Sequence, residues 1–349
     1  MRVSLAKSDR SFSASPDRSL LDAAIAAGLR LPHSCRSGNC GACRARLLRG
    51  SVNYPHGAPL GLSAEETASG YVLLCQARAR EDLALDVDEI RLADDAVVKR
   101  LPCRIERAQL LAHDVIALYL RLPAVETFTH EAGQYIDVLL AGGRRRSFSI
   151  ASPPRDRGLI ELHVRRVPGG EFTDRLFAAN PEKGLLSIEG PLGAFRYHPP
   201  EGPADTPMLM LAGGTGYAPL NSILHHLAAL GSERPVTLYF GVRTERDLYA
   251  DAAIRELAGR APGLRYVPVL SEPSPAWSGK RGLVHEAALA DHDRLSDVDI
   301  YASGPPAMII ALRRDFLARG ARPSRLYVDS FDYAEDPPPR QPSSASTKS

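Results

Sequence analysis

The sequence has few of the features that would place it at once in a familiar class of protein. Among its 349 residues, no apolar run approaches the roughly 20 residues that a bilayer-spanning helix needs, and the opening MRVSLAKSDRSFSAS lacks the apolar stretch of a signal peptide. The formal net charge is only +2, with acidic and basic residues mixed, so the chain lacks the excess of positive charge that is typical of nucleic-acid-binding proteins. No internal repeat is present. We therefore expect a globular, cytoplasmic protein of roughly two or three domains.

Cysteine is also scarce, and four of the five cysteines follow one pattern. Cys35, Cys40 and Cys43 have the spacing C-x4-C-x2-C, and Cys75 follows farther along. In a reducing compartment such a cluster indicates metal binding or catalysis rather than disulfides. The spacing is that of plant-type [2Fe-2S] sites, whereas a structural zinc site, the main alternative, usually has two short-spaced pairs. The four cysteines are therefore predicted cluster ligands, and Cys103 is a predicted core residue.

Small residues separate the first three cysteines, which suits a loop whose backbone amides approach inorganic sulfur. They are Ser37, Gly38, Gly41 and Ala42.

Along the rest of the chain, the pattern of apolar and polar residues changes twice. Short strands and one helix, SLLDAAIAAGL, surround the cysteine loop, and a charged connector follows. Next come alternating strands separated by Gly and Pro turns, as in a small antiparallel β-barrel, and then strands alternating with helices, as in a parallel α/β sheet. The predicted boundaries are 1–94, a linker at 95–100, 101–203, 204–333, and a disordered Pro- and Ser-rich tail at 334–349.

The cysteine loop and this order of domains resemble a known family. The first third is similar to plant-type ferredoxins, with a β-grasp fold. The whole chain except the tail resembles the ferredoxin-linked NADH reductases of bacterial multicomponent oxygenases, and also the reductases of CDP-6-deoxy-glucoseen chemistry. The resemblance implies a β-barrel that binds FAD and an α/β domain that binds NAD(P)H.

The stretch RRSFSIAS carries the first half of the flavin site that the resemblance implies. Arg146, Phe148 and Ser149 match the family's R-x-Y-S motif, with Phe in place of Tyr. In such a motif the ring stacks on the flavin, the hydroxyl bonds near its reactive edge, and the guanidinium pairs with phosphate. Phe148 keeps the stacking surface and loses only a phenol hydroxyl. Taken alone, RSFS could also be an ordinary strand with an exposed arginine.

A glycine turn about two dozen residues later resembles the second half of the site. Gly169 and Gly170 would let backbone N–H groups close on a pyrophosphate, Thr173 would add a hydroxyl, and a helix starting there would present its positive end. The resemblance assigns three further residues to the flavin and favours FAD over FMN: His163, Val164 and Arg165.

The segment MLMLAGGTGYAPL is an apolar strand, a tight glycine turn and the start of a helix, which brings phosphates to a helix N-terminus. It is neither G-x-G-x-x-G nor a Walker A loop, and a glycine turn alone could be merely topological. It resembles the pyridine-nucleotide motif of the ferredoxin-NADP reductase superfamily. The residues concerned are Gly213, Gly214, Thr215 and Gly216.

Two further segments resemble the same superfamily. Gly241 and Arg243 correspond to the adenosine-ribose side of the pocket, and SGPPAM to the part beside the nicotinamide, with Gly304, Pro305 and Met308. The mixed charges of RTERDLY favour NADH over NADPH.

Three residues are expected to act where nicotinamide meets flavin. Ser149 is the first, and Ser303 is the second, standing where the family commonly has Cys, so that hydride transfer should survive at a lower rate. Phe331 resembles the family's C-terminal aromatic residue, although an aromatic closing the core is an equal alternative.

Together these features predict an NADH-dependent reductase that passes electrons through FAD and a [2Fe-2S] cluster to an oxygenase or an intermediate ferredoxin. The alternatives are an electron donor for deoxysugar C-3 deoxygenation and, from another class, a zinc-bound or redox-sensing regulator. We expect a monomer without nucleic-acid partners. Arg36, Arg44 and Arg46 flank the cysteine loop and are either a docking face for an acidic acceptor or solvated surface charges.

Overall fold

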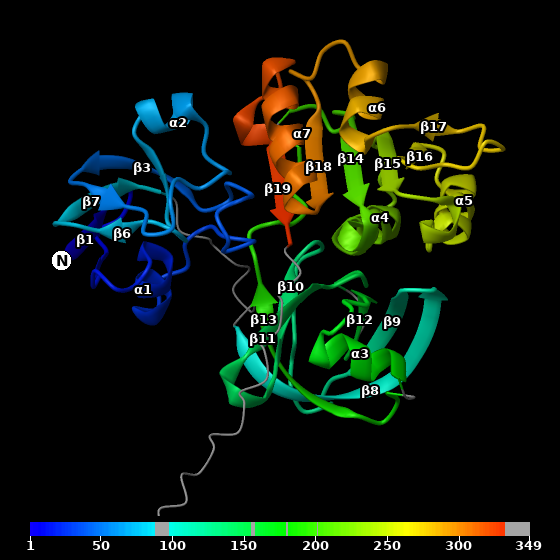
Figure 1. Ribbon diagram of the computed structural model, residues 1–349, viewed down its shortest axis with the longest axis horizontal. Coiled ribbons are helices and arrows are strands. Elements are labelled where there is room, and N and C mark those ends of the chain that lie inside the picture. The colour runs from blue at the N-terminus through cyan, green and yellow to red at the C-terminus, as the bar shows by residue number, and fades with distance from the viewer. Residues whose placement is uncertain (88–97, 155–157, 179–180, 201, 332–349) are drawn as a thin grey trace, which may run out of the picture.

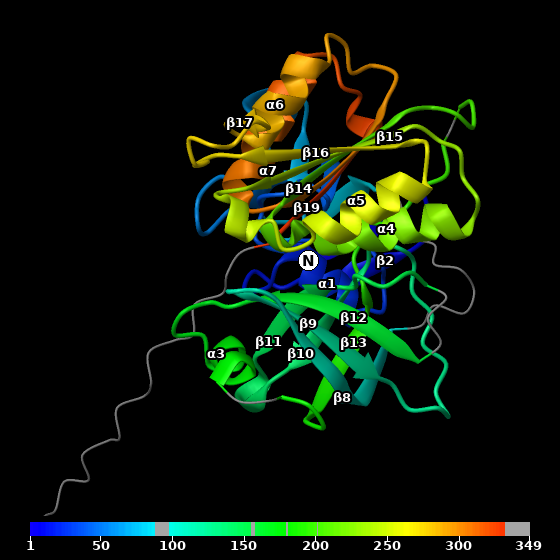
Figure 2. The ribbon, with the colours of Figure 1, turned by 90° about the vertical axis from the view of Figure 1, so that its right-hand side faces the viewer.

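The computed structural model describes residues 1–87, 98–154, 158–178, 181–200 and 202–331. They form three lobes, each with its own sheet (Figure 1). The N-terminal lobe lies to one side of the other two in Figure 1 and behind them in Figure 2, and those two lie one above the other in both views. This is the predicted three-part architecture.

The N-terminal lobe is a mixed five-stranded sheet of order β2-β1-β7-β3-β5 packed on helix α1 (Leu20–Ala26). The Ser19 side chain caps α1 by accepting a hydrogen bond from the Asp22 amide, at the place where the sequence predicts the helix to begin. Strands β1 and β7 are parallel, and the other described pairs of this sheet are antiparallel, as in a β-grasp fold. The strands are β1 (Arg2–Leu5), β2 (Ser11–Ser13), β3 (Arg44–Arg49), β5 (Tyr71–Leu73) and β7 (Leu83–Asp86).

A smaller layer completes this lobe. Strands β4 (Val52–Asn53) and β6 (Arg78–Ala79) pair with each other, and α2 (Ala64–Ala68) begins at a capping box formed by Ser63 and Glu66.

The middle lobe is an antiparallel six-stranded sheet of order β11-β10-β13-β8-β9-β12. A bridge between Ile150 and Leu162 joins the two outer strands, so that the sheet closes on itself as a barrel. Its elements are β8 (Lys99–Ala112), β9 (Val115–Arg121), β10 (Tyr135–Leu139), β11 (Arg145–Ser149), β12 (Leu159–Arg165), α3 (Glu171–Ala178) and β13 (Leu185–Leu192), with the 3-10 turn η1 (Ala141–Gly143).

The C-terminal lobe is a parallel sheet of order β17-β16-β15-β14-β18-β19. Every residue of β14 and β18 is buried, as expected for central strands covered by helices on both faces. Helices α4 and α5 pack on one face, and α6 and α7 pack on the other. The strands are β14 (Met208–Gly213), β15 (Val236–Val242), β16 (Leu264–Leu270), β17 (Lys280–Arg281), β18 (Asp299–Gly304) and β19 (Leu326–Ser330).

The helices of this lobe are α4 (Tyr217–Ala229), α5 (Asp251–Arg260), α6 (Val284–Asp291) and α7 (Pro306–Ala318), with 3-10 turns η2 (Gly214–Gly216), η3 (Glu245–Asp247) and η4 (Pro323–Arg325). Strand β8 begins at Lys99, inside the predicted linker, while the tail at 334–349 lies outside the described residues. In the described part of the chain, no helix combines the length and apolar character needed to cross a bilayer.

The N-terminal lobe contacts both of the others at its cysteine loop. The His33 carbonyl accepts a hydrogen bond of 2.8 Å from the Ala194 amide of the barrel. Cys40 packs within the apolar core of the C-terminal lobe, together with Leu312 and Phe316 of α7. The loop is thus placed where all three lobes meet.

Candidate functional site

The four cysteines with the predicted spacing come together in one buried loop region. Cys40, Cys43 and Cys75 are at most 7% exposed, and Cys35 is half-buried. The Cys40 amide lies 3.4 Å from the Cys35 sulfur and points its N–H at it. The Cys35 thiol contacts that of Cys40, and the Cys43 thiol contacts that of Cys75. All five cysteines carry free thiols, and Cys103 lies apart in the barrel core, as predicted.

Contact between these thiols moves their pKa values in opposite directions. The hydrogen bond with the Cys40 thiol lowers the pKa of Cys35 to about 5, against the effect of burial. The same bond and burial raise the pKa of Cys40, and contact with Cys75 together with burial raises that of Cys43. A set of buried thiols that cannot all ionise unaided suits a positively charged iron centre, which would hold them as thiolates.

Glycine is required in this loop for backbone reasons. Gly38 and Gly41 have φ values of +84° and +76°, a region that other residues rarely adopt. A Cβ at Gly38 would also lie 2.8 Å from the Gln76 side chain, whose Nε2 donates to the Arg36 carbonyl. The backbone conformation and the close packing at these positions therefore favour glycine in the loop that carries the cysteines.

A cavity of 290 Å³ lies between this loop, the barrel and the end of β19. It brings together residues that the sequence analysis assigned to the cluster, to the flavin and to the C-terminal aromatic position. They include Cys35, Arg146, Phe148, Ser149, Gly170, Thr173 and Phe331.

The cavity has the character of a flavin site. Phe148 and Phe172 present a pair of aromatic rings with centroids 5.7 Å apart. The Ser330 hydroxyl, which also lines the cavity, is buried and has no hydrogen-bond partner among the described residues. A buried hydroxyl normally finds a partner, so a ligand with polar groups would complete this wall. The residues present therefore fit the isoalloxazine end of a flavin.

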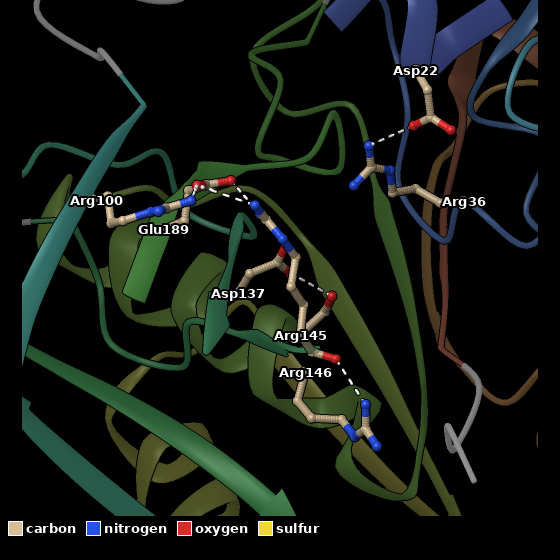
Figure 3. Close-up of polar contacts among 8 residues, drawn as sticks. Asp22, Arg36, Arg100, Asp137, Arg145, Arg146 and Glu189 are labelled. Atoms are coloured by element: carbon tan, nitrogen blue, oxygen red, sulfur yellow. Dashed lines mark hydrogen bonds and ion pairs between the residues drawn. The ribbon is translucent and has the colours of Figure 1, made fainter. Parts of the chain in front are cut away.

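The neighbouring arginines Arg145 and Arg146 have different environments (Figure 3). Arg145 forms ion pairs with Asp137, at 3.4 Å, and with Glu189, which also pairs with Arg100. Arg146 donates to the Arg145 carbonyl at 2.9 Å, and its guanidinium points away from those carboxylates. Arg146 is therefore the better of the two candidates for a phosphate ligand.

The second half of the predicted flavin site is only partly assembled at this cavity. A helix does follow the glycine turn, and Gly170 and Thr173 line the cavity. Gly169 does not line it, and its N–H donates to Asp174 over 2.9 Å. The Thr173 hydroxyl bonds with both the N–H and the carbonyl of Val167, each at 3.1 Å.

The three residues that the resemblance assigned to the flavin lie on β12 and do not line this cavity. Val164 is fully buried in the barrel core. His163 bonds to Glu161 and to the Tyr249 hydroxyl, at 3.1 and 3.0 Å. Arg165 lines a different cavity, beside the glycine turn of the C-terminal lobe.

That second cavity, of 390 Å³, lies where β14, β15 and β18 end. Ligands of parallel sheets bind at this edge. It collects most of the predicted nucleotide residues: Gly213, Gly214, Thr215, Gly241, Arg243, Pro305 and Met308. Gly216 and Gly304 lie behind its wall, where the chain is so closely packed that a Cβ at Gly216 would come within 2.0 Å of the Ser303 carbonyl oxygen.

The charged side chains of this cavity come from two lobes. Arg165 donates from Nε to Asp114 over 2.7 Å, so the barrel supplies a held guanidinium beside Gly214. Asp247 accepts from the amide and the hydroxyl of Thr244, at 2.9 and 2.8 Å. Although burial opposes it, these bonds and the nearby His113 and Arg165 lower the pKa of Asp247, which keeps a negative charge at the cavity.

Sequence reasoning missed a buried carboxylate, Asp329, at the flavin cavity. Burial raises its pKa to about 6, while the hydroxyls of Ser34, Ser149 and Ser303 oppose that rise. Asp329 lies opposite Ser303 in the pairing of β18 with β19, and it accepts a hydrogen bond from Ser34 of the cysteine loop. Its signal in the sequence was a polar residue at the end of an otherwise apolar strand, LYVDS, directly before the expected Phe331.

Comparison with known families explains this arrangement. Three family models match successive parts of the chain: the 2Fe-2S iron-sulfur cluster binding domain at residues 3–80, the oxidoreductase FAD-binding domain at 102–197, and the oxidoreductase NAD-binding domain at 210–314. Over 337 residues the chain is 37% identical to the reductase subunit of an Amycolatopsis aromatic O-demethylase, covering 95% of this chain and 99% of that protein. The chain belongs to the family of iron-sulfur flavoprotein reductases.

The reductase has other relatives of nearly full length. It is 36% identical to the CDP-6-deoxy-L-threo-D-glycero-4-hexulose-3-dehydrase reductase of Yersinia pestis, covering 95% of this chain and 98% of that one. It is 33% identical over 334 residues to reductase component 1 of the terephthalate 1,2-dioxygenase of Comamonas sp., covering 95% of this chain and 97% of that one. Among solved structures, the Amycolatopsis cytochrome P450 reductase GcoB matches with a TM-score of 0.74 and 35% identity, covering 95% and 99%.

These findings confirm several predictions. The reductase is an oxidoreductase with domains for a [2Fe-2S] cluster, FAD and NAD, in the predicted order. The individual ligand residues stay predictions, as do the domain boundaries.

The arginines beside the cysteine loop do not form one free surface. Arg44 pairs with Glu66, which also contacts Arg313 of α7 at 3.2 Å. Arg36 pairs with Asp22 at 3.0 Å and lines the flavin cavity (Figure 3). Of the three arginines only Arg46 is exposed, so the structure gives no support to a docking face built from all three.

Proposed function

We propose that this reductase takes electrons from NADH and delivers them to a separate oxygenase component. The observation that carries the proposal is the flavin cavity, because its wall includes both Cys35 of the cluster loop and the flavin motif residues Phe148 and Ser149. FAD would accept two electrons from NADH and release them singly, and a [2Fe-2S] cluster carries one electron at a time. Electron transfer from FAD to the cluster requires the two cofactors to lie close together, and a shared cavity wall would provide this.

The protein residues in this proposal bind and orient. Arg146 would hold a flavin phosphate, Phe148 would stack on the ring, and Ser149 would bond at its reactive edge. Cys35, Cys40, Cys43 and Cys75 would hold the cluster.

On the nucleotide side, backbone N–H groups of the turn at Gly213 and Gly214 would donate to the phosphates of NADH, with Arg165 and Arg243 nearby. Ser303 and Phe331 would border the nicotinamide. We also propose NADH rather than NADPH, because the Asp247 carboxylate lines the cavity and would repel a 2′-phosphate. Glu245, in contrast, is bonded to Ser274, at 2.5 Å from its hydroxyl.

The test is an anaerobic absorption spectrum before and after a slight excess of NADH, followed by addition of candidate acceptors. Flavin and iron-sulfur bands that bleach together, and then recover only when an oxygenase component is added, are the expected result. A spectrum without the iron-sulfur envelope, despite full flavin occupancy, would contradict the assignment of the cysteines.

A second candidate acceptor is the partner of a deoxysugar dehydrase. Its support is the 36% identity to the Yersinia reductase over 98% of that protein, close to the 37% shared with the aromatic O-demethylase reductase. The same reduced protein, mixed with each purified acceptor, separates the two: the correct acceptor reoxidises it at a rate that rises with acceptor concentration. A cytoplasmic location and a monomeric state remain predictions.

A further inference from the structure

One hydrogen bond joins the cluster loop to the last strand of the C-terminal lobe. The Ser34 hydroxyl donates to Asp329 Oδ1, and the two residues are separated by 295 positions in the sequence. Both are buried, at 5% and 7% exposure. A buried carboxylate is costly without partners, so the Ser34 hydroxyl contributes to keeping Asp329 in place.

The bond lies on the wall of the flavin cavity. Ser34 directly precedes the predicted ligand Cys35, and Asp329 directly precedes Ser330 and Phe331; all five line this cavity. The bond therefore links the place predicted for the cluster with the strand that borders the flavin.

Other contacts among the described residues also hold the N-terminal lobe in this position, in addition to the packing of Cys40. They include the backbone hydrogen bond of 2.8 Å from Ala194 to His33 and the ion pair of Arg313 with Glu66. The bond between Ser34 and Asp329 differs from both because it lies inside the flavin cavity itself. Its loss would loosen the loop at the point where the two redox groups would face each other.

We propose that Ser34 and Asp329 are a positioning pair, which holds the cluster loop against the flavin cavity and so sets the rate of electron transfer from reduced flavin to the cluster. Each transfer would oxidise a bound flavin by one electron and reduce a bound cluster by one, with no bond between protein atoms broken. The rate therefore responds to how the two groups are held. The proposal rests on the proposed assignment of the cavity to FAD and of the four cysteines to the cluster.

The first experiment compares Ser34→Ala with Ser51→Ala. Ser51 is a matched control because its hydroxyl also donates to a carboxylate, that of Glu81 at 2.6 Å, but within the N-terminal lobe. Anaerobic stopped-flow mixing with NADH follows flavin reduction and cluster reduction as separate phases. A hydrogen bond to a charged group has a free energy equivalent to about a tenfold change in an equilibrium. Ser34→Ala should slow cluster reduction about tenfold and slow flavin reduction by a smaller factor.

A second readout does not depend on turnover. Hydrogen-deuterium exchange of the amides at 33–37 and 326–331 should speed up in Ser34→Ala and stay unchanged in Ser51→Ala. Asp329→Asn keeps an acceptor oxygen for Ser34 but loses the charge, so it should slow cluster reduction relative to the parent protein by less than about tenfold. If Ser34→Ala fails to incorporate iron, this comparison with the parent protein replaces it, and an unchanged rate in Asp329→Asn would count against the inference.

Three results would overturn the inference: equal cluster-reduction rates in Ser34→Ala and Ser51→Ala, parallel slowing of both phases, or unchanged exchange at both segments. Absence of iron or FAD from the parent protein would instead refute the proposed function on which the inference rests. The two failures are thus distinguishable.

Discussion

Replacing Gly216 by alanine should damage the nucleotide site by direct overlap of atoms. The added Cβ would lie 2.0 Å from the Ser303 carbonyl oxygen, 2.5 Å from its carbon and 2.9 Å from the Gly304 nitrogen. All three are backbone atoms of β18 or its end, so no side chain can rotate away. Gly216 has an ordinary helical backbone, with φ −60° and ψ −10°, so the expected effect comes from contact and not from a strained dihedral.

The overlap sets the expected magnitude. Overpacking a close-packed interior typically costs about 1–3 kcal/mol, and contact between backbone atoms should place this variant at the upper end, about 3 kcal/mol. Relief of the overlap requires the turn of η2 to move away from β18. Because this turn is where the nucleotide phosphates are proposed to bind, NADH-dependent flavin reduction should weaken more than FAD or iron content does.

Gly259→Ala provides the matched control. Gly259 lies in α5, and a Cβ there would meet nothing within 4 Å. The same substitution should therefore stabilise the protein by about 0.5–1 kcal/mol, as expected for Gly to Ala in a helix. Thermal or denaturant unfolding measures both variants, and the rate of flavin reduction against NADH concentration measures the site. Equal stability of the two variants, or unchanged NADH dependence in Gly216→Ala, would refute the reasoning.

Four further predictions follow from single residues. Cys43→Ser should remove the iron-sulfur absorption and leave the flavin bands, whereas a retained cluster would mean that the ligand set is wrong. Asp247→Asn keeps an acceptor for Thr244 but removes the charge, so the preference for NADH over NADPH, measured as a ratio of kcat/KM values, should fall about tenfold. Ser303→Ala and Ser303→Cys should both change the rate of flavin reduction, and two unchanged rates would exclude a role for its hydroxyl. Burial lowers the pKa of His130 from 6.5 to about 4, so the neutral ring is favoured in the folded state. The free energy of unfolding should therefore be independent of the ionisation of His130 above pH 6.5 and should fall by about 3 kcal/mol in all as the pH is lowered toward 4. His130→Gln should flatten this pH dependence in unfolding measurements.

Much of this protein could be predicted from local sequence. The spacing of Cys35, Cys40 and Cys43 identified the cluster loop because the ligands of such a loop are close together in the sequence. Their spacing along the chain then determines how their sulfur atoms are arranged. The apolar strand and glycine turn ending at Gly216 likewise identified the nucleotide edge, because strand, turn and helix are consecutive. Alternating and continuous apolar patterns separated the antiparallel barrel from the parallel sheet for the same reason.

Other features depend on residues far apart in the chain, and only the tertiary structure decided them. The cavity that joins Cys35 to Phe148 exists because three lobes meet there, and local periodicity carries no information about how lobes pack. Arg165 lies beside the nucleotide turn because β12 runs past the C-terminal lobe, which its own motif does not specify. The hydrogen bond between Ser34 and Asp329 is the clearest example. Neither residue belongs to a motif in its own segment, and the two form a bond only because the fold buries both at the wall of the flavin cavity.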